Sequence, residues 1–307
     1  MDARFKTPIL FIIFNRPDVT TKVFNEIKKI RPSKLYVVAD GPRTNKDLED
    51  RKCEDTRRII DLIDWDCEVF KNYSDTNLGC KKRVSSGINW FFENVEEGII
   101  LEDDCLPNES FFKFCEEMLV KYRNEERIGM ISGNNFQFGK VKKEYSYYFS
   151  RYSHIWGWAT WRRAWNKYNV NIDSWPEIKK EGKLKKTFSN IQDVYYWSSI
   201  FDDVYNNKID TWDYQWTFTC LINNYLSVMP SVNLITNIGF SQSDSTHTRR
   251  ISKFSNMKSV NLDFPLAEPP TIERSVESDK ITQRDNYPFW RFFIGKIIKR
   301  LINKYNK

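Results

Sequence analysis

The stretch from Gly98 to Pro107 constrains this chain most, because an apolar run of strand length ends there in three consecutive carboxylates, Glu102, Asp103 and Asp104. An amphipathic segment, 111–122, follows, and the whole pattern predicts a buried strand, an acidic loop and a helix. Ligands of open α/β sheets bind beyond the carboxyl ends of the strands. Because adjacent acids repel one another, we expect a cation there, and a divalent ion carrying a substrate phosphate fits. The alternative is a solvated acidic turn that stabilises the next helix through its dipole.

Residues 7–104 alternate between strand and helix patterns. This alternation predicts a parallel sheet with right-handed crossovers. The first helix is expected over 19–30, with Asp18 or Thr20 as its N-cap. Neither GxGxxG after the first strand nor GxxxxGK[ST] is present, which disfavours the dinucleotide-binding and P-loop classes. The apolar runs that predict strands in this region are 7–14, 35–39, 68–70 and 98–101.

Charged residues follow three of these predicted elements. Arg16 stands between the first strand and its helix, where a guanidinium and a helix N-terminus both favour an anion; the alternative is a surface arginine. Asp40 ends the second strand, where an acid accepts hydrogen bonds from a base or a ribose hydroxyl. Lys82 and Arg83 lie in the first turn of a later helix, a position that disfavours cations, so they indicate a neighbouring anion.

After residue 125 the pattern changes. Strand-like runs occur at 128–133, 227–230 and 232–235, and 175–208 has a charged helical pattern. The segment 145–165 is dense in aromatic residues and forms either a wall of the substrate site or a second small hydrophobic core.

Asp213 lies between two large aromatic residues, Trp212 and Tyr214. Apolar surroundings raise the pKa of a carboxyl group, which suits a general base; the alternative is a helix N-cap acid. Residues 239–248 form a polar loop of the kind that closes over ligands, and it carries Thr246 and His247. A solvent-exposed histidine is the alternative for His247.

The C-terminal part of the chain contains two segments that differ in composition. Residues 251–287 contain several prolines and are expected to form an extended linker. Residues 288–307 alternate apolar and cationic residues at helical spacing, which predicts an amphipathic helix lying on an anionic membrane. The alternative is a helix packed on the body or on a partner. We therefore divide the chain into a domain over 1–250, the linker over 251–287 and the helix over 288–307.

Composition limits the classes further. The 307 residues are 40% hydrophobic, which indicates a globular protein, and the net charge of +7 gathers toward the C-terminus, which argues against nucleic acid as the partner. Six cysteines without a CxxC pair and only two histidines argue against structural zinc. We expect reduced cysteines and, without a signal peptide or an apolar run of spanning length, a cytoplasmic protein on the inner face of the cell membrane.

Together these motifs resemble nucleotide-sugar-dependent glycosyltransferases with the GT-A fold, most closely the inverting N-acetylglucosaminyltransferase I family and related bacterial proteins. The likeness covers about residues 7–248. It implies an α/β fold with a Rossmann-like, mostly parallel central sheet flanked by helices. It is carried by the arginine turn Phe14-Asn15-Arg16, the strand-tip acid Asp40, the triplet Glu102-Asp103-Asp104 before Pro107, and Trp212-Asp213-Tyr214-Gln215-Trp216.

The resemblance also implies roles for these residues. Asp104 would bind Mn²⁺ (or Mg²⁺) directly, with His247 as a further candidate ligand, and Asp213 would be the catalytic base. The residues that would hold the nucleotide-sugar are Arg16, Asp40, Glu102, Asp103, Trp212 and Thr246, and to these we add Lys82 and Arg83 on the ground of charge alone.

The function expected is an inverting, metal-dependent transfer of a sugar, for example GlcNAc, from a UDP-sugar to a hydroxyl of a glycan or lipid-linked acceptor. One base and no enzyme nucleophile imply single displacement. Two alternatives stay open: a sugar nucleotidyltransferase, although its usual glycine-rich loop is absent, and a catalytically silent sugar- or nucleotide-binding scaffold.

Overall fold

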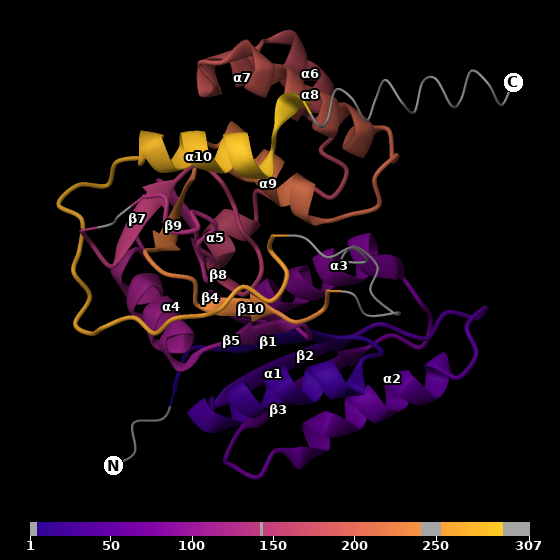
Figure 1. The fold of residues 1–307 in the computed structure, drawn as a ribbon. Coiled ribbons are helices and arrows are strands. Elements are labelled where there is room, and N and C mark those ends of the chain that lie inside the picture. Colours follow the sequence, from indigo (N-terminus) through magenta and orange to yellow (C-terminus); the bar gives the residue numbers. More distant parts are fainter. Residues whose placement is uncertain (1–4, 142–143, 241–252, 291–307) are drawn as a thin grey trace, which may run out of the picture.

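The computed structural model describes residues 5–141, 144–240 and 253–290. Within these ranges the chain forms an eight-stranded sheet with the order β3-β2-β1-β4-β8-β6-β9-β7, covered by helices (Figure 1). The α/β class with a large, mostly parallel central sheet is therefore confirmed. The strands are β1 (Ile9–Ile13), β2 (Lys34–Ala39), β3 (Glu68–Tyr73), β4 (Glu97–Glu102), β6 (Ile128–Ser132), β7 (Tyr147–Ser150), β8 (Trp158–Trp161) and β9 (Leu226–Pro230).

The first half of the sheet is parallel throughout. β1 pairs in parallel with β2 on one side and with β4 on the other, and β2 pairs in parallel with β3. In register, Ile13 is opposite Ala39 and Ile12 is opposite Glu102. The carboxyl ends of β1, β2 and β4 therefore lie level, at one edge. Beyond β4 the sheet is mixed, because β8 runs antiparallel to β4 and β6 while β6 and β9 pair in parallel.

Alternate residues of the central strands face two different cores. Phe11 of β1 packs among residues of α1 (Pro17–Ile30) and α4 (Glu109–Lys121), whereas Leu10 packs with α3 (Gly79–Asn94) on the opposite face. Such two-sided burial explains why these strands read as continuous apolar runs. α2 (Glu49–Arg58) and the short 3₁₀ helix Ile59–Leu62 connect β2 to β3 beside α1.

The start of α1 differs from the expectation. Arg16 is the N-cap residue and Pro17 is the first helical residue, so the predicted caps, Asp18 and Thr20, both lie inside the first turn. Proline suits this position because the first helical N–H has no partner within the helix. The helix ends at Ile30, and its C-cap residue, Arg31, has a left-handed φ of 47°.

The acidic triplet does not cap α4. A short strand, β5 (Cys105–Pro107), separates them, and Asn108 caps the helix by accepting a hydrogen bond from the Phe111 N–H at 3.1 Å. β5 pairs antiparallel with β10 (Ile235–Asn237). Asp103 and Asp104 are also buried, so the interpretation of the triplet as a solvated turn is wrong.

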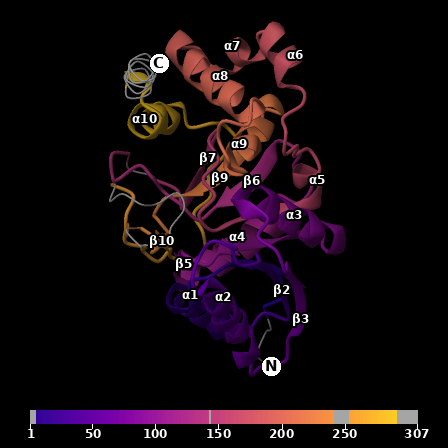
Figure 2. The ribbon, with the colours of Figure 1, turned by 90° about the vertical axis from the view of Figure 1, so that its right-hand side faces the viewer.

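A helical layer lies at the far end of the molecule from α1 and α2 (Figures 1 and 2). It contains α6 (Trp175–Lys180), α7 (Lys183–Thr187) and α8 (Ile191–Tyr205), which occupy the segment predicted as helical. Together with α9 (Asp213–Ile222) they enclose a core of their own, rich in aromatic side chains. The short helix α5 (Arg162–Trp165) follows β8 directly.

The aromatic segment 145–165 is mostly core. Of the two interpretations left open for it, the hydrophobic core therefore accounts for most of its residues, and His154 and Trp156 are the exceptions described below. The buried aromatic side chains of this segment are Tyr147, Tyr148, Phe149, Tyr152, Trp158, Trp161 and Trp165.

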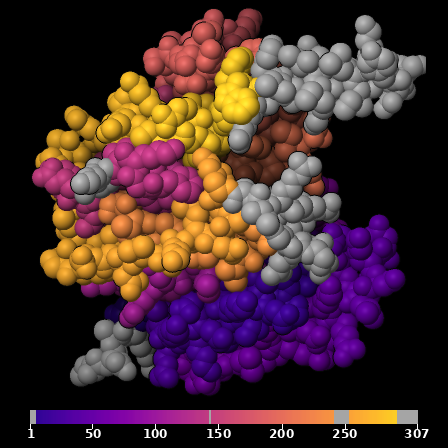
Figure 3. Space-filling view, in the orientation of Figure 1, coloured from indigo at the N-terminus to yellow at the C-terminus, as the bar shows by residue number. Residues whose placement is uncertain are grey.

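The predicted extended linker contains a helix, α10 (Val276–Asn286). The interpretation of 276–286 as extended is therefore wrong. The residues before α10 lie along the surface (Figure 3) and are tied to the body: the Leu262 N–H donates to Ser110 Oγ at 2.9 Å, and Phe149 and Arg274 form a parallel bridge.

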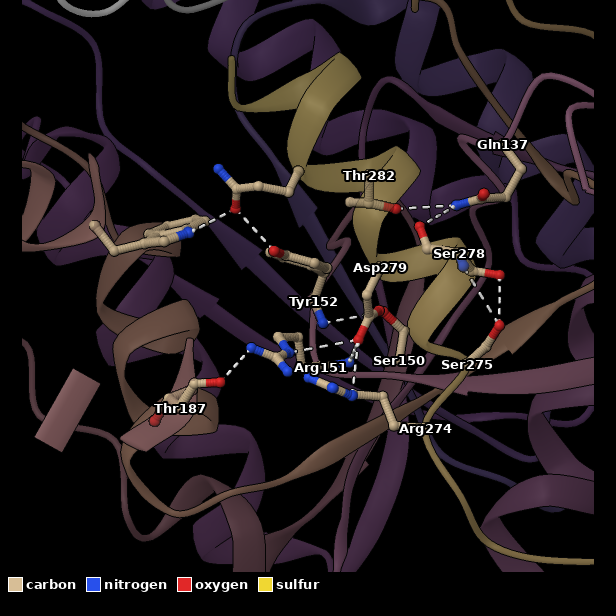
Figure 4. Close-up of polar contacts among 12 residues, drawn as sticks. Gln137, Ser150, Arg151, Tyr152, Thr187, Arg274, Ser275, Ser278, Asp279 and Thr282 are labelled. Atoms are coloured by element: carbon tan, nitrogen blue, oxygen red, sulfur yellow. Dashed lines mark hydrogen bonds and ion pairs between the residues drawn. The ribbon is translucent and has the colours of Figure 1, made fainter. Parts of the chain in front are cut away.

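Polar contacts fix α10 on the body (Figure 4). The buried carboxylate of Asp279 accepts a hydrogen bond from Ser150 Oγ at 2.6 Å and lies 3.4 Å from Arg151 Nε and 3.5 Å from Arg274 Nε. Gln137 donates to Thr282 Oγ1 at 2.9 Å. Most of the predicted 288–307 helix lies outside the described residues. None of the helices in the described ranges has the length and hydropathy needed to span a membrane.

Candidate functional site

The candidate site lies where the strand order changes direction. The chain moves outward from β1 to β2 and β3, and then returns to place β4 on the other side of β1. In open α/β sheets this switch point leaves a crevice at the carboxyl ends of the two strands, which is where ligands bind. Arg16 follows β1 there, and the acidic triplet begins at the last residue of β4.

Arg16 contacts two of the three acids. Its Nε and Nη2 atoms donate to the two carboxylate oxygens of Asp103, the former at 3.3 Å, and its Nη1 donates to Asp104 Oδ2 at 3.1 Å. Only 14% of the Arg16 side chain is exposed. Burial acts against the charged guanidinium, but the charges of Asp103 and Asp104 outweigh it and raise the pKa of Arg16. The cation expected beside the triplet is therefore present in the chain itself.

Glu102, the last residue of β4, has a different environment. Burial raises the pKa of its carboxyl group to about 8, and the charges of Asp104 and Asp103 act in the same direction. The negative charge of Asp213 also raises the pKa of Glu102. The three consecutive acids thus differ in role: two share an arginine, and Glu102 favours the protonated form.

The backbone after β10 lies directly on the acidic loop. The Ile238 N–H donates to the Asp104 carbonyl oxygen at 2.9 Å, and a Cβ atom at Gly239 would lie 2.2 Å from Asp104 Oδ2 and 2.8 Å from Arg16 Nη1. Only glycine fits this approach. We gave Gly239 no role from sequence, although a glycine directly after a strand signals a close backbone approach.

Asp40 is buried and fully occupied by the protein. Its Oδ1 accepts hydrogen bonds from the N–H groups of Gly41 and Leu78 at 3.0 and 2.9 Å. Its Oδ2 accepts from the Gly79 N–H at 3.0 Å and from Asn77 Nδ2 at 3.1 Å. These four donors fill the acceptor positions of the carboxylate. Asp40 therefore holds the start of α3, and a contact with a nucleotide base requires the loss of one of these bonds.

The two cations predicted beside the phosphates have different environments. Arg83 is buried and its Nη2 donates to Asn72 Oδ1 of β3 at 2.9 Å, which ties α3 to the sheet. Lys82 is exposed on α3. Neither position supports the role that we assigned from charge alone.

Asp213 is the first residue of α9, and Trp212 is its N-cap residue. The Oδ1 atom of Asp213 accepts from the Tyr214 N–H at 2.9 Å and from Thr211 Oγ1, while in the described part of the chain its Oδ2 has no hydrogen-bond partner. The ring of Trp212 is 2% exposed and stacks on Trp158 with centroids 5.9 Å apart. Trp212 is thus a core residue that precedes Asp213, and its predicted contact with a nucleotide-sugar has no support from its burial.

A cavity of about 190 Å³ opens in front of Asp213. Trp156 forms another part of its wall and packs edge-on against Phe240, the residue after Gly239, with centroids 5.6 Å apart. The cavity is therefore connected through Trp156 and Phe240 to the backbone that covers the acidic loop, and the charge of Asp213 acts on Glu102. His154 also lines it, and burial lowers the pKa of that imidazole to about 3, so it is neutral at physiological pH.

The donor chemistry for a metal is present only in part. Consecutive carboxylates are the hard oxygen ligands that Mn²⁺ and Mg²⁺ prefer. Within the described ranges, however, no three His, Cys, Asp or Glu side chains are grouped as a metal site, and Arg16 contacts Asp104 Oδ2. The predicted ligand His247 and the predicted diphosphate contact Thr246 lie outside the described residues.

This sequence matches no protein-family model, and a search of curated proteins found no significant match.

Proposed function

We propose that this protein is an inverting glycosyltransferase of the GT-A type that transfers a sugar, for example GlcNAc, from a UDP-sugar to a hydroxyl of a glycan or lipid-linked acceptor. The observation that carries the proposal is the acidic triplet at the β1/β4 switch point, together with Asp213, whose charge acts on Glu102 and which lines a cavity. The switch point is the place for the nucleotide, and the cavity is the place for the sugar that receives the transferred group.

Mn²⁺ or Mg²⁺ is part of the proposal. Asp104 would hold the ion, and the ion would stabilise the charge that develops on the departing diphosphate. For Asp104 Oδ2 to serve as a ligand of the ion, Arg16 would have to give up its hydrogen bond to that oxygen. Released from Asp104, the Arg16 guanidinium remains beside Asp103 and is a second donor toward a phosphate oxygen.

Asp213 is the proposed base. An acceptor hydroxyl attacks the anomeric carbon, the bond from that carbon to the diphosphate oxygen breaks with its electron pair leaving on the oxygen, and the hydroxyl proton passes to Asp213 Oδ2. Thr211 Oγ1 and the Tyr214 N–H hold Oδ1 and so fix the direction of Oδ2. A single displacement of this kind inverts the anomeric configuration.

The first experiment is a thermal-shift panel of nucleoside diphosphates and nucleotide-sugars, each with and without Mn²⁺. A ligand that binds only the folded state raises the melting temperature by mass action. We expect a metal-dependent shift with one nucleotide that is lost in Asp104→Ala and kept in Asp18→Ala, a surface acid. Asp213→Asn should keep the shift and lose turnover. Retention of anomeric configuration, or full turnover by Asp213→Asn, would overturn the mechanism.

A catalytically silent nucleotide- or sugar-binding protein is the second candidate. It is favoured by the pairing of Arg16 with both Asp103 and Asp104, which compensates part of their negative charge without a metal. Such a protein would bind a nucleotide with the same affinity with and without Mn²⁺ and would show no turnover.

The membrane is the proposed location, on the cytoplasmic face of a bacterial cell, with a surface polysaccharide or glycolipid precursor as acceptor. The support is the alternation of cations and apolar residues in the sequence 291–307. Deleting 291–307 should move the protein from the pellet to the supernatant when it is sedimented with anionic liposomes. The deletion spares Phe289, which packs against Tyr195. An unchanged distribution would remove this part of the proposal.

A further inference from the structure

The cavity in front of Asp213 is lined by residues from distant parts of the chain. Its walls come from Phe136, the segment before β8, α9, Phe254 and the end of α10. The α10 contribution is Asn286 and Tyr287, in the part of the chain that follows the region likened to glycosyltransferases. Asp279, which is fixed by Ser150 and Arg151, anchors the helix that carries them (Figure 4). The docking of α10 therefore places Asn286 and Tyr287 in the wall of the cavity.

The walls of the cavity are aromatic. Phe136 and Trp156 pack edge to face with centroids 5.3 Å apart, and Tyr214 and Tyr287 line the cavity as well. Aromatic rings offer flat apolar surfaces for the C–H groups on one face of a sugar ring. The volume of about 190 Å³ equals that of about six water molecules, which is room for one ring rather than a chain of rings.

Polar groups converge on the same space. The side-chain nitrogen of Asn286 is buried and has no hydrogen-bond partner in the described structure, while the Asn286 oxygen accepts from Lys253 Nζ at 3.2 Å. Asp213 Oδ2 is an acceptor on the opposite element, α9. The hydroxyls of Ser153 and Thr217, 2.8 Å apart, also border the cavity. A buried donor without a partner is costly, so Asn286 favours a ligand that brings an acceptor.

The charges select against an acidic ligand. Asp213 is the one acidic residue among the described residues that line the cavity, and no lysine or arginine is among them; Lys253, whose Nζ donates to Asn286 Oδ1 at 3.2 Å, is not part of the lining. The buried His154 is neutral and offers no compensating charge. A hydroxyl group both donates and accepts hydrogen bonds. Ligand hydroxyls can therefore pair with the Asn286 nitrogen and with Asp213 Oδ2 without bringing a charge into the cavity.

We propose that this cavity binds one uncharged sugar ring of the acceptor, stacked on Trp156 and held by Asn286, with its reacting hydroxyl at Asp213; the proposal rests on the glycosyl transfer proposed above. It assigns α10 a part in the choice of acceptor. Asn286 is a specificity-determining residue in this scheme, because its side-chain nitrogen donates to a hydroxyl that does not react.

Saturation-transfer difference NMR on the full chain tests this, with methyl β-galactoside, methyl α-mannoside and methyl β-glucoside as neutral probes and methyl β-glucuronide as the acidic one. Each is measured alone and with UDP and Mn²⁺. We expect a signal from at least one neutral glycoside and none from the glucuronide. Asn286→Asp, which keeps the shape and removes the donor, should weaken the affinity by about tenfold. Trp156→Leu should do the same, and Tyr205→Ala, an exposed aromatic on α8, should leave it unchanged.

The same samples are taken through the nucleotide thermal-shift panel, so that the two proposals fail separately. A nucleotide shift without a signal from any neutral glycoside, or with equal signals in wild type and Asn286→Asp, overturns the acceptor cavity and leaves the transferase in place. A glycoside signal without any nucleotide shift overturns the acceptor role together with the transferase. Circular dichroism of each variant checks the fold, and Asn286→Asp, a near-isosteric change, keeps the test decisive if Trp156→Leu fails to fold.

Discussion

Arg16 Nη1 lies 3.1 Å from Asp104 Oδ2, although the strands β2, β3 and β4 lie between the two residues in the sequence. The contact exists because β4 enters the sheet beside β1 and brings its acidic end to the arginine turn. It gives the free protein a positive charge at the position where the resemblance implies a metal ion.

Removal of this arginine should be strongly destabilising. Arg16→Gln leaves Asp103 and Asp104 buried without their cation, so we expect the free energy of unfolding to fall by about 3–5 kcal/mol. Urea denaturation measures it. Arg58→Gln breaks an ion pair whose two side chains are well exposed, and should cost about 0.5 kcal/mol or less. Equal losses of unfolding free energy in Arg16→Gln and Arg58→Gln would contradict the stabilising role given to the buried contacts of Arg16.

The glycine at the acidic loop should tolerate no side chain. Gly239→Ala places a Cβ atom against Asp104 and Arg16, so we expect about 1–3 kcal/mol of destabilisation and a weaker nucleotide-induced thermal shift. Gly139→Ala is the control. Gly139 has a left-handed φ but open space around it, so alanine strains the backbone there without touching the site. A nucleotide shift that stays the same in both variants would argue against the site.

Asp40 should contribute mainly to the stability of the folded protein. Asp40→Asn replaces one carboxylate oxygen by an amide nitrogen facing N–H donors of the Leu78–Gly79 turn, and we expect a loss of about 1.5–3 kcal/mol in the free energy of unfolding. Asp18→Asn also removes an acid near a helix N-terminus, but an exposed one, and should cost about 0.3–1 kcal/mol. A variant Asp40→Asn with wild-type stability and lost nucleotide binding would instead favour the base-binding role.

The docking of α10 should depend on pH. Burial raises the pKa of Asp279 from 3.8 to about 6, so between these values the folded state binds more protons than the unfolded state. The contribution of Asp279 to stability is therefore fully present below about pH 4 and is lost as the pH rises toward 6, by up to about 3 kcal/mol.

The stability difference between wild type and Asp279→Asn, measured by urea denaturation from pH 4 to pH 7, isolates this effect. It should shift in favour of the asparagine variant as the pH rises. Asp285→Asn is the matched control, because Arg284 holds the pKa of Asp285 below its usual range and the corresponding difference should stay flat above pH 5. If the stability difference between wild type and Asp279→Asn also stays constant with pH, the predicted pH dependence is wrong.

Much of the fold was predictable because its signals are local. The buried strands of the first half show as apolar runs, since both faces of each strand are covered, and the helices show as 3.6-residue periodicity. The helix α10 was missed because its mean hydropathy is low and prolines surround it; it is held by a buried polar cluster around Asp279, which leaves no apolar stripe in the sequence.

By itself, the sequence determined that an acidic triplet ends a buried strand and that Arg16 and Asp40 end two others, because each of these facts concerns residues adjacent in the chain. Tertiary structure alone decided how they are used. Strand order brought Arg16 to Asp103 and Asp104, while the start of α3 took every acceptor position of Asp40. The same packing buried Trp212 in the core and opened the cavity at Asp213 between segments that no local pattern connects. Contacts of this kind depend on which helices and strands pack together. That packing is determined by the burial of whole faces of helices and sheets rather than by any single motif.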